Sequence, residues 1–329
     1  MLYRNNLKSR EFGKESPQNS SPKRATIALG QGASEEAHFE ANSTMPKTDS
    51  SGCFGINIIS LPCVDMREGP SEKSQVVSQA LFGEAVEVLK KQKTWFFIKT
   101  SDHYTGWIRE GIVAKERPLR ADLEVSRLQA HVYAQPDTVF GPLMTLPFGA
   151  PLERVSADER WHQVLLPDGR SAFIQKGDTE PEPFDLAPFS QKFLGLPYTW
   201  GGRCSFGFDC SGFIQMLFAR MGVALPRDAR QQVHCGSVIE PRLLGDLIFW
   251  GHSSGDIRHV GMLLDGERFI HTSARENKPY LRISQLSDPE WNGSGFYAYR
   301  CARRIDVQTS NSERHSATDR ADQTARLLH

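Results

Sequence analysis

The stretch that decides the fold runs TWGGRCSFGFDCSGFIQMLFARMGV, over residues 199–223. Its first half is rich in glycine, and its second half repeats apolar residues at helical spacing on one face. That face holds Ile214, Leu217, Phe218 and Met221. The pattern predicts a glycine-rich loop that runs into an amphipathic helix, with Cys210 at the junction.

Cys210 is the candidate nucleophile. A residue at the start of a helix faces unpaired backbone N–H groups and the positive end of the helix dipole. Both favour the thiolate, which is the form that attacks, and a protonated histidine nearby would lower the pKa from about 8.5 to as low as about 3–4. Cysteines inside apolar stripes are more often structural, and Cys204, Cys235 and Cys301 fit that description better.

A thiol needs a base, and the base needs a group that orients it. His259 begins the strand-like run HVGMLL, and His271 ends the next run, RFIHTSA. The short turn at Asp265-Gly266 would make these runs antiparallel neighbours and bring both imidazoles to one end of the sheet. The sequence therefore predicts a Cys–His–His set.

The residues around this set predict an α+β domain. A short helical period over 187–194 and the helix after Cys210 come first. Strand-like runs then follow at 246–251, 259–266, 268–274 and 296–303. Helices followed by an antiparallel sheet are typical of the α+β class.

An internal repeat lies upstream. Phe82-Gly83 recurs as Phe148-Gly149, Trp95 as Trp161, and Trp107-Ile108 as Phe173-Ile174, with one offset of 66 (148 − 82, 161 − 95, 173 − 107). Each copy reads as three short alternating runs, 85–91, 94–101 and 105–110 in the first, and 151–157, 160–167 and 171–177 in the second. Strands at this density predict two small barrels, in which the two tryptophans serve packing.

Composition sets the remaining boundaries. We expect disordered tails over 1–52 and 307–329, barrels over 53–118 and 119–180, and a catalytic domain over 181–306. Lys plus Arg and Asp plus Glu both number 39, which disfavours nucleic-acid binding. No apolar run approaches the roughly 18 residues of a membrane helix. Without a CxxC pair we expect no metal or other cofactor.

The N-terminal residues carry no recognisable secretory signal. We therefore expect a cytoplasmic protein, or a periplasmic or extracellular one if the true start differs. A monomer that acts on peptides and contacts neither nucleic acid nor membrane fits this composition.

The motifs TWGG, DCSGF, HVGM and FIH, spread over about 190–303, resemble the NlpC-type family of cysteine peptidases. The resemblance implies a papain-like catalytic domain and cleavage of peptidoglycan stem peptides through an acyl-enzyme. It implies that Cys210 is the nucleophile, His259 the general base and His271 the residue that orients it. Tyr198 would assist the backbone at the oxyanion, or else serve packing.

Two SH3-like barrels before this domain resemble the YkfC-type γ-D-glutamyl-L-diamino-acid endopeptidases, which require a free N-terminal L-Ala. The resemblance implies that Asp228 binds the N-terminal amine of the substrate. It also implies that Glu68 and Tyr104 are the contacts that the first barrel provides. Ala229 stands where that group commonly has serine. Trp200, Asp209 and Ser211 would line the pocket. Glu68 could instead be an exposed loop charge, and Asp228 a helix N-cap.

The sequence alone leaves other functions open. The same three residues would serve an amidase or an acyltransferase, because a different nucleophile can resolve the acyl-enzyme. A non-enzymatic wall-binding protein is the third possibility, with the barrels holding glycan or peptide. The sequence does not choose between diaminopimelate and lysine at the third substrate position.

Overall fold

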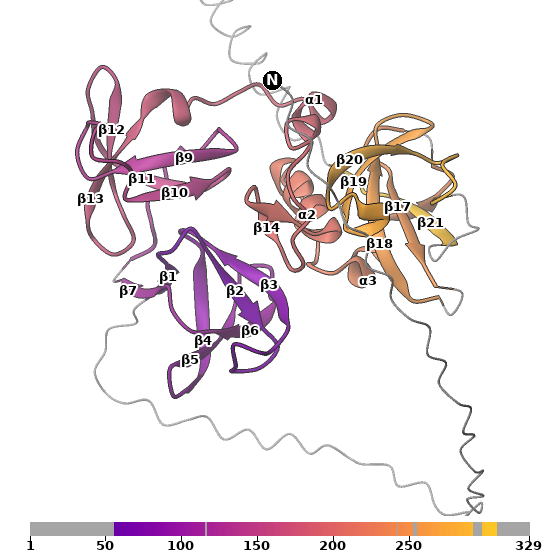
Figure 1. Ribbon diagram of the computed structural model, residues 1–329, viewed down its shortest axis with the longest axis horizontal. Coiled ribbons are helices and arrows are strands. Elements are labelled where there is room, and N and C mark those ends of the chain that lie inside the picture. Colours follow the sequence, from indigo (N-terminus) through magenta and orange to yellow (C-terminus); the bar gives the residue numbers. More distant parts are fainter. Residues whose placement is uncertain (1–55, 116, 242, 253–254, 292–297, 308–329) are drawn as a thin grey trace, which may run out of the picture. The chain divides into compact units, whose positions relative to one another are not determined.

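The computed structural model describes residues 56–115, 117–241, 243–252, 255–291 and 298–307. The two predicted tails lie outside these ranges, apart from residue 307. Within them, three large antiparallel sheets follow one another along the chain, with a two-stranded ribbon before the last, and all three α-helices belong to the last of the three modules (Figure 1). This is the predicted class, an α+β domain preceded by an all-β region.

The first barrel is a seven-stranded sheet in the order β3-β2-β6-β5-β4-β1-β7. Alternate side chains of its strands point inward because successive residues of a strand face opposite sides. Ile59, Met66, Ile98 and Ile108 thereby form a core with no exposed surface. The strands are β1 (Ile56–Ile59), β2 (Cys63–Arg67), β3 (Val76–Leu81), β4 (Ala85–Gln92), β5 (Trp95–Lys99), β6 (Thr105–Ile108) and β7 (Ile112–Lys115).

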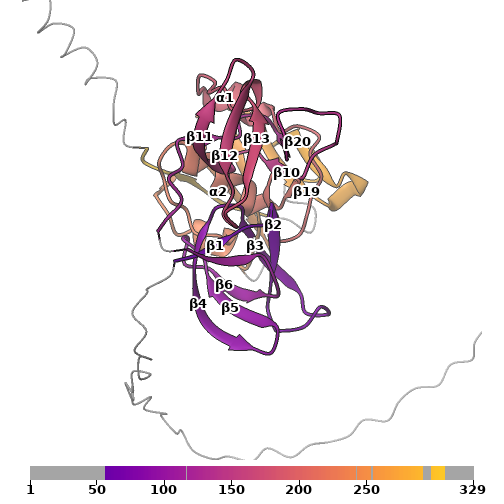
Figure 2. The same ribbon diagram turned by 90° about the vertical axis from the view of Figure 1, so that its left-hand side faces the viewer.

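The second barrel repeats this arrangement in the order β10-β9-β13-β12-β11-β8. The strands β9, β11, β12 and β13 each begin 66 residues after β2, β4, β5 and β6 (129 − 63, 151 − 85, 161 − 95, 171 − 105), so the sequence repeat is a structural one. Figures 1 and 2 show the two sets of strands as separate bodies. The strands are β8 (Leu123–Glu124), β9 (Gln129–Tyr133), β10 (Met144–Pro147), β11 (Pro151–Ala157), β12 (Trp161–Leu165) and β13 (Ser171–Gln175).

The catalytic module pairs a central helix with a six-stranded sheet in the order β16-β21-β17-β18-β19-β20. The sheet strands are β16 (Ser237–Ile239), β17 (Leu247–Gly251), β18 (Ile257–Leu263), β19 (Arg268–Ser273), β20 (Tyr280–Gln285) and β21 (Ala298–Arg304). The chain reaches this sheet through η1 (Lys176–Asp178), α1 (Leu186–Gln191), the ribbon of β14 (Arg203–Cys204) and β15 (Gly207–Phe208), α2 (Cys210–Arg220) and α3 (Ala229–Gln232). A short 3-10 helix, η2 (Arg275–Asn277), follows β19.

The apolar face of α2 holds this module together. Ile214, Leu217 and Phe218 of the helix are buried in one cluster with Val260 and Met262 of β18. Full burial of one such side chain stabilises the fold by about 1.5–3 kcal/mol. This packing holds α2 against β18, the two elements that carry Cys210 and His259.

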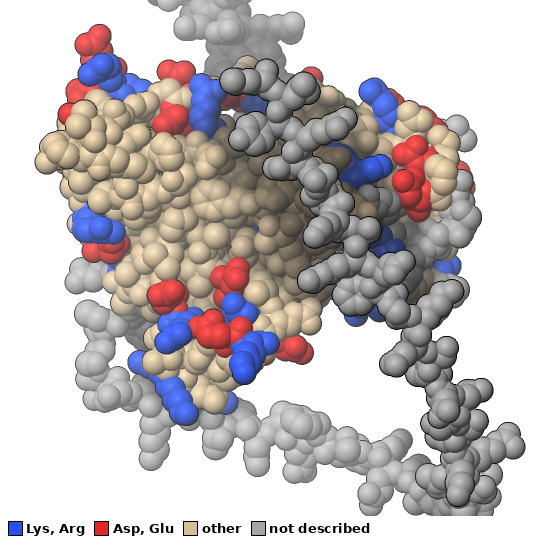
Figure 3. Space-filling view, in the orientation of Figure 1, with Lys and Arg blue, Asp and Glu red and all other residues tan. Residues whose placement is uncertain are grey.

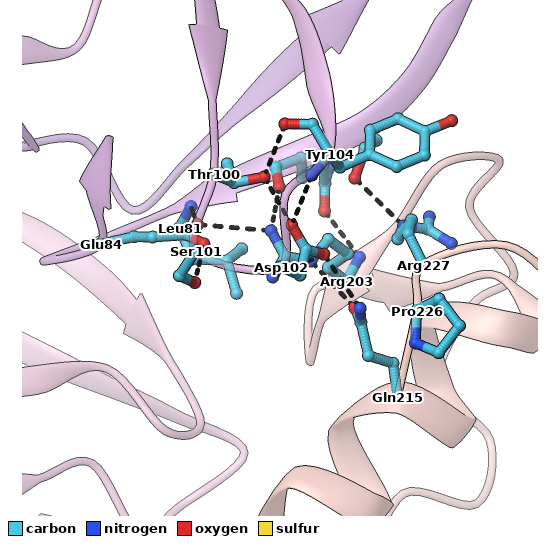
Figure 4. A network of polar contacts seen from close by, with 12 residues as sticks. Leu81, Glu84, Thr100, Ser101, Asp102, Tyr104, Arg203, Gln215, Pro226 and Arg227 are labelled. Atoms are coloured by element: carbon cyan, nitrogen blue, oxygen red, sulfur yellow. Dashed lines mark hydrogen bonds and ion pairs between the residues drawn. The ribbon is translucent and has the colours of Figure 1, made fainter. Parts of the chain in front are cut away.

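The first barrel docks on the catalytic module through a polar network (Figure 4). Arg203 of β14 donates to the carbonyl of Gln79 at 2.7 Å and pairs with Glu84 at 3.3 Å and Asp102 at 3.5 Å. Gln215 of α2 donates to the same Asp102 carboxylate at 2.9 Å. These side chains come from both modules, so the network fixes the first barrel beside the start of α2.

The surface has no large area of one charge on the face drawn in Figure 3, where basic and acidic side chains lie next to one another. Among the described residues, no helix is both long and apolar enough to span a membrane.

Candidate active site

Cys210 is the first residue of α2, and Asp209 is its N-cap. One Asp209 carboxylate oxygen accepts from the backbone N–H of Gly212 at 2.7 Å, and the other accepts from the N–H of Gly201 at 3.0 Å. A side chain at Gly212 would collide with the carbonyl of Gly202, whose oxygen lies 2.2 Å from the Cβ position. The DCSG motif therefore caps the helix and lets the glycine-rich loop lie against it.

Arg227 stabilises this helix cap through a buried ion pair with Asp209. Its guanidinium pairs with both Asp209 oxygens, at 3.0 and 2.6 Å, and is only 1% exposed. It also donates to Ser211 Oγ at 3.0 Å and to Ser78 Oγ of the first barrel at 3.1 Å. A two-bond pair of this kind fixes orientation as well as position. The N-terminus of α2 is thus tied to the first barrel by one buried arginine.

The two histidines meet as their places in the hairpin predict. His259 Nε2 lies 3.0 Å from His271 Nδ1, and His271 Nε2 lies 3.0 Å from Ser284 Oγ. The three residues come from the adjacent strands β18, β19 and β20. They form a chain of hydrogen bonds. His259 joins this chain through Nε2, so Nδ1 is its ring nitrogen that His271 does not contact.

Aromatic rings fix both imidazoles in place. The Trp291 ring stacks on His259 with centroids 5.0 Å apart, and Trp250 lies 5.6 Å from the same imidazole. Phe269 lies 4.8 Å from His271. The two histidines are only 2% and 1% exposed. Such packing leaves each imidazole few alternative rotamers, so the hydrogen-bond chain is held in one geometry.

Cys210 and His259 share the wall of one cavity of about 520 Å³. The cavity is bounded by four parts of the chain, namely the first barrel, the glycine-rich loop, the starts of α2 and α3, and the sheet. Its wall consists of Gln75, Val77, Tyr104, Tyr198, Trp200, Asp209, Cys210, Ser211, Asp228, Ala229, Arg230, Ile257, Arg258, His259, Ser273, Ala274 and Arg275. His271 lies behind this wall.

The protonation of the pair differs from the sequence-based prediction. Burial, and second the charge of Asp209, raise the pKa of the Cys210 thiol to about 12. Hydrogen bonds from the backbone N–H groups of Val260 and Ser211 act in the opposite direction and are outweighed. Burial therefore acts against the thiolate that the helix terminus favours, because the desolvation of the sulfur exceeds the effect of the helix terminus.

The imidazoles are shifted toward their neutral forms. Burial, and then the charges of Arg282 and Arg275, lower the pKa of His259 to about 3. Burial, and then His259 and Arg282, lower the pKa of His271 well below its usual value. Both shifts favour the uncharged forms, a thiol and a neutral imidazole in the wall of one cavity, and a neutral imidazole is the state of a base that has yet to accept a proton.

One end of the cavity is acidic. The Tyr104 hydroxyl of the first barrel hydrogen-bonds the Asp228 carboxylate, and burial together with that charge raises the pKa of Tyr104 to about 12. Burial likewise raises the pKa of Asp228, against the lowering effect of Arg227. Trp200, another residue of the cavity wall, donates from Nε1 to the Val76 carbonyl of the first barrel at 2.9 Å. A carboxylate among hydrogen-bond acceptors in a half-buried pocket suits a cation.

The structure does not bring every predicted site residue to the cavity. Tyr104, Tyr198, Trp200, Asp209, Ser211, Asp228 and Ala229 lie on the wall. Glu68 does not, because it is exposed in the turn after β2. Its backbone N–H donates to the Gln75 carbonyl at 2.9 Å, which puts it next to a wall residue. Its role stays a prediction.

Sequence reasoning missed several residues of this site. Ser284 lies on β20, a strand that the sequence analysis did not predict. Arg227 directly precedes Asp228 and reads as an ordinary loop charge. Trp250 gave no signal because a tryptophan in an apolar run reads as core, and Trp291 gave none because it stands alone in a polar segment. Across the described ranges, no group of three or more His, Cys, Asp or Glu side chains is placed to hold a metal ion.

Comparison with known proteins agrees with this geometry. The NlpC/P60 family model matches residues 195–304, and the bacterial SH3 domain model matches residues 64–113. A gamma-D-glutamyl-L-lysine dipeptidyl-peptidase of Bacillus subtilis is 31% identical over 228 residues, which are 63% of this chain and 76% of the relative. The chain belongs to the NlpC/P60 family. It is a cysteine peptidase of that family with an SH3-like region before the catalytic domain.

Two further comparisons cover most of the described part of the chain. A gamma-D-glutamyl-L-lysine dipeptidyl-peptidase of Bacillus cereus is 29% identical over 243 residues, which are 66% of this chain and 72% of the relative. The crystal structure of an NlpC/P60 family protein from Bacillus cereus has 25% sequence identity and a TM-score of 0.66. It covers 76% of this chain and 99% of that protein. The NlpC/P60 likeness therefore extends across both the barrels and the catalytic domain.

Proposed function

We propose that this NlpC/P60 peptidase hydrolyses the bond between γ-D-glutamate and the diamino acid of peptidoglycan stem peptides that begin with a free L-Ala. The observation that carries the proposal is the shared cavity. It places Cys210 and His259 beside an acidic end that the first barrel completes with Tyr104.

The closed acidic end supports recognition of a free amine. An N-terminal ammonium group would be held by the Asp228 carboxylate, the acceptor that Tyr104 already contacts. A longer chain on that side would have to pass the Trp200 side chain, which is hydrogen-bonded to the first barrel. The two Bacillus relatives are named dipeptidyl-peptidases, which agrees with a cleft that holds two residues before the cleaved bond.

The chemistry begins with a proton transfer. As the Cys210 sulfur attacks the γ-carbonyl carbon, its proton passes to Nδ1 of His259, the nitrogen that His271 does not contact. For Nδ1 to accept it, Nε2 must carry a hydrogen and donate to His271 Nδ1. His271 then donates from Nε2 to Ser284 Oγ. With the hydrogen bonds in this direction, His259 has the tautomer that a general base requires.

The developing oxyanion forms beside the start of α2. The backbone N–H of Cys210 and the Tyr198 hydroxyl would donate to it, in a cavity wall already fixed by packing. The His259 imidazolium protonates the leaving amine, and the diamino-acid part departs. Water, activated by the same imidazole, then attacks the thioester and releases L-Ala-D-Glu.

The proposal is tested with the tripeptide L-Ala-γ-D-Glu-L-Lys and mass spectrometry of its products. Wild-type protein should release L-Ala-D-Glu, and Cys210→Ala should release none above background. Cys235→Ala is the matched control, because this cysteine lies outside the cavity wall and should leave turnover unchanged. Full turnover by Cys210→Ala would refute the assignment of the nucleophile.

The N-terminal requirement has its own test. Acetylation removes the positive charge and adds bulk at the acidic end, so we expect at least a 100-fold loss of kcat/KM on N-acetylated tripeptide. Asp228→Asn should raise KM for the free tripeptide and should change kcat less. Cleavage of both peptides at equal rates would contradict the amine pocket and leave the nucleophile assignment standing.

A free-amine requirement would restrict the enzyme to wall fragments rather than intact wall, which carries its stem peptides on glycan. We propose on this ground that it acts in the cytoplasm on recycled peptides. Cell fractionation with an antibody against the native protein tests this, and a signal confined to the exported or wall fraction would contradict it.

A further inference from the structure

Two cysteines outside the active site meet where the first barrel contacts the catalytic module. Cys63 begins β2 of the first barrel, and Cys204 ends the ribbon strand β14 of the catalytic module. Both are free thiols, and their side chains hydrogen-bond each other. The proposed peptidase reaction uses neither of them.

The strand register of the first barrel accounts for this contact. Cys63 and Asp65 are alternate residues of β2, so their side chains point to the same face of the sheet. Gln79 of β3 lies opposite Asp65 and donates to its carboxylate from Nε2 at 3.3 Å, so it shares this face. Cys204 Sγ lies 3.8 Å from Oε1 of the same Gln79. The ribbon therefore places Cys204 on the face of β2 and β3 that carries Cys63.

The two thiols differ in exposure. Cys63 is half-buried and lies on the wall of a cleft of about 770 Å³ that is lined by residues of the first barrel. This cleft and the catalytic cavity share no wall residue. Cys204 is only 2% exposed. A small molecule can therefore reach Cys63 from solvent without entering the catalytic cavity, whereas Cys204 is shielded.

The hydrogen bond between the thiols gives them different chemistry. It lowers the pKa of Cys63, although burial and the charge of Asp65 act in the opposite direction. The same hydrogen bond, and then burial, raise the pKa of Cys204 above its usual value. The more exposed member of the pair is thus the better thiolate, and the thiolate is the form that oxidants attack.

We propose that Cys63 is a site of oxidation by peroxides and that Cys204 resolves the oxidised form, so that a disulfide bond joins the first barrel to the catalytic module. The oxidant class is hydrogen peroxide or a small organic hydroperoxide, which a cleft of this size admits. Thiol–disulfide exchange with a small thiol reverses the bond. The inference does not depend on which peptide bond the enzyme cleaves.

The oxidation proceeds in two balanced steps. The Cys63 thiolate attacks one oxygen of hydrogen peroxide, the O–O bond breaks, and the departing hydroxide takes up a proton and leaves as water. This step gives a sulfenic acid at Cys63. Cys204 Sγ then attacks the sulfenic sulfur, its proton passes to the departing hydroxyl group, and a second water leaves. The two thiols together lose two electrons, which reduce the peroxide to water.

The bond would lie directly beside the polar network that docks the first barrel. Arg203, the residue before Cys204, contacts Gln79, Glu84 and Asp102 of the barrel (Figure 4). The bond would span 141 positions of the chain (204 − 63), and a disulfide that closes a long loop restricts the unfolded chain most. Oxidation should therefore hold the barrel, and its part of the cavity wall, more firmly on the catalytic module.

The chemical test uses the full chain with Cys210→Ala, so that oxidation of the active-site thiol does not contribute. The protein is treated with hydrogen peroxide, free thiols are alkylated, and its peptides are analysed by mass spectrometry before and after reduction. We expect a cross-linked pair of peptides, two hydrogen atoms lighter than their sum, whose fragmentation assigns the bond to Cys63 and Cys204. Alkylation of both thiols after peroxide treatment would overturn the proposal.

Three cysteine variants in the same background assign the roles. Cys204→Ser should leave Cys63 as a sulfenic acid that dimedone traps, at least about tenfold more than dimedone labels Cys204 in the Cys63→Ser protein. The control Cys235→Ser removes a half-buried thiol outside the pair and should leave the yield of cross-link unchanged. Equal labelling of Cys63 and Cys204 in the two variants would contradict the assigned roles.

The effect on docking is measured by hydrogen exchange and thermal unfolding of the Cys210→Ala protein. Oxidation should slow exchange of β3 and β14 at least about tenfold and raise Tm by about 5 °C, and reduction should reverse both changes. The Cys63→Ser variant, treated identically, should show neither change. A cross-link that forms without slower exchange would refute the effect on docking.

Discussion

The two ring nitrogens of His271 contact different partners, and one of these partners is His259. Ser284 Oγ lies 3.0 Å from Nε2 of His271, while Nδ1 faces His259. Ser284 touches no substrate in the proposed reaction, so it is a positioning residue. It acts through the tautomer of His271.

We expect Ser284→Ala to lower kcat by about fivefold, the factor that corresponds to one hydrogen bond of about 1 kcal/mol, with KM unchanged. Steady-state kinetics on the tripeptide measure it. Ser284→Thr keeps the hydroxyl and should restore kcat, which a merely structural role would not require. A kcat within twofold of wild type in the alanine variant would contradict the positioning role.

The raised thiol pKa of Cys210 makes a prediction about pH. A thiol whose pKa is near 12 is protonated throughout the neutral range, so its alkylation should accelerate about tenfold per pH unit. The rate of carbamidomethylation of Cys210 by iodoacetamide, followed by peptide mass spectrometry between pH 5 and 9, measures this. A plateau between pH 5 and 7 would instead indicate a preformed thiolate–imidazolium pair.

At the scale of elements, the catalytic geometry depends on how three of them meet. The α2 helix carries Cys210, β18 carries His259 and β19 carries His271. Gly261 allows the close contact of β18 and β19, since a Cβ there would lie 2.8 Å from the Phe269 ring. Asp209 and Arg227 then fix the helix start, and their pair is buried.

Removal of one member of a buried pair leaves the other charge without compensation. We expect Arg227→Met to lower the free energy of unfolding by about 3–5 kcal/mol and to lower kcat/KM, because the cap of α2 loses its support. Urea unfolding of the full chain measures the first quantity.

The control for this prediction is Arg109→Met, which breaks the exposed pair with Glu72. That change should cost less than about 1 kcal/mol, since both side chains are in water. Equal effects of the two substitutions would show that burial of Arg227 does not matter to stability.

At the scale of the whole molecule, the first barrel supplies part of the cavity wall. Gln75, Val77 and Tyr104 come from it, and the Arg203 network holds it in place (Figure 4). Burial acts to raise the pKa of Asp102, but Arg203 and hydrogen bonds from Thr100 and Gln215 lower it below its usual value. Substrate recognition therefore depends on the docking of two modules.

We expect Arg203→Ala to raise KM for the free tripeptide by about tenfold with little change in kcat, because Asp102 and Glu84 lose their cation and the barrel is held less firmly. Hydrogen exchange of β3 and β14 should accelerate in parallel. Arg154→Ala, which breaks an exposed pair within the second barrel, is the control. Unchanged KM and unchanged exchange would contradict the docking role.

Much of this protein was predictable from local pattern. The 66-residue repeat, the three strands predicted in each barrel, the helix after Cys210 and the hairpin of the two histidines are all present. These features are encoded by residues close in the chain, where alternation, helical spacing and turn residues act directly. The sequence determined the fold class and, by resemblance, the family and its candidate nucleophile.

Only the tertiary structure decided what lies around that nucleophile. Ser284, Arg227 and Arg275 reach the site from β20, from the loop before α3 and from η2, and nothing in their local sequence marks them. The burial that raises the pKa of the Cys210 thiol likewise comes from residues far from it in the chain. Helix position is readable from neighbours in the chain, but desolvation and the field of distant charges exist only once the chain has folded and excluded water.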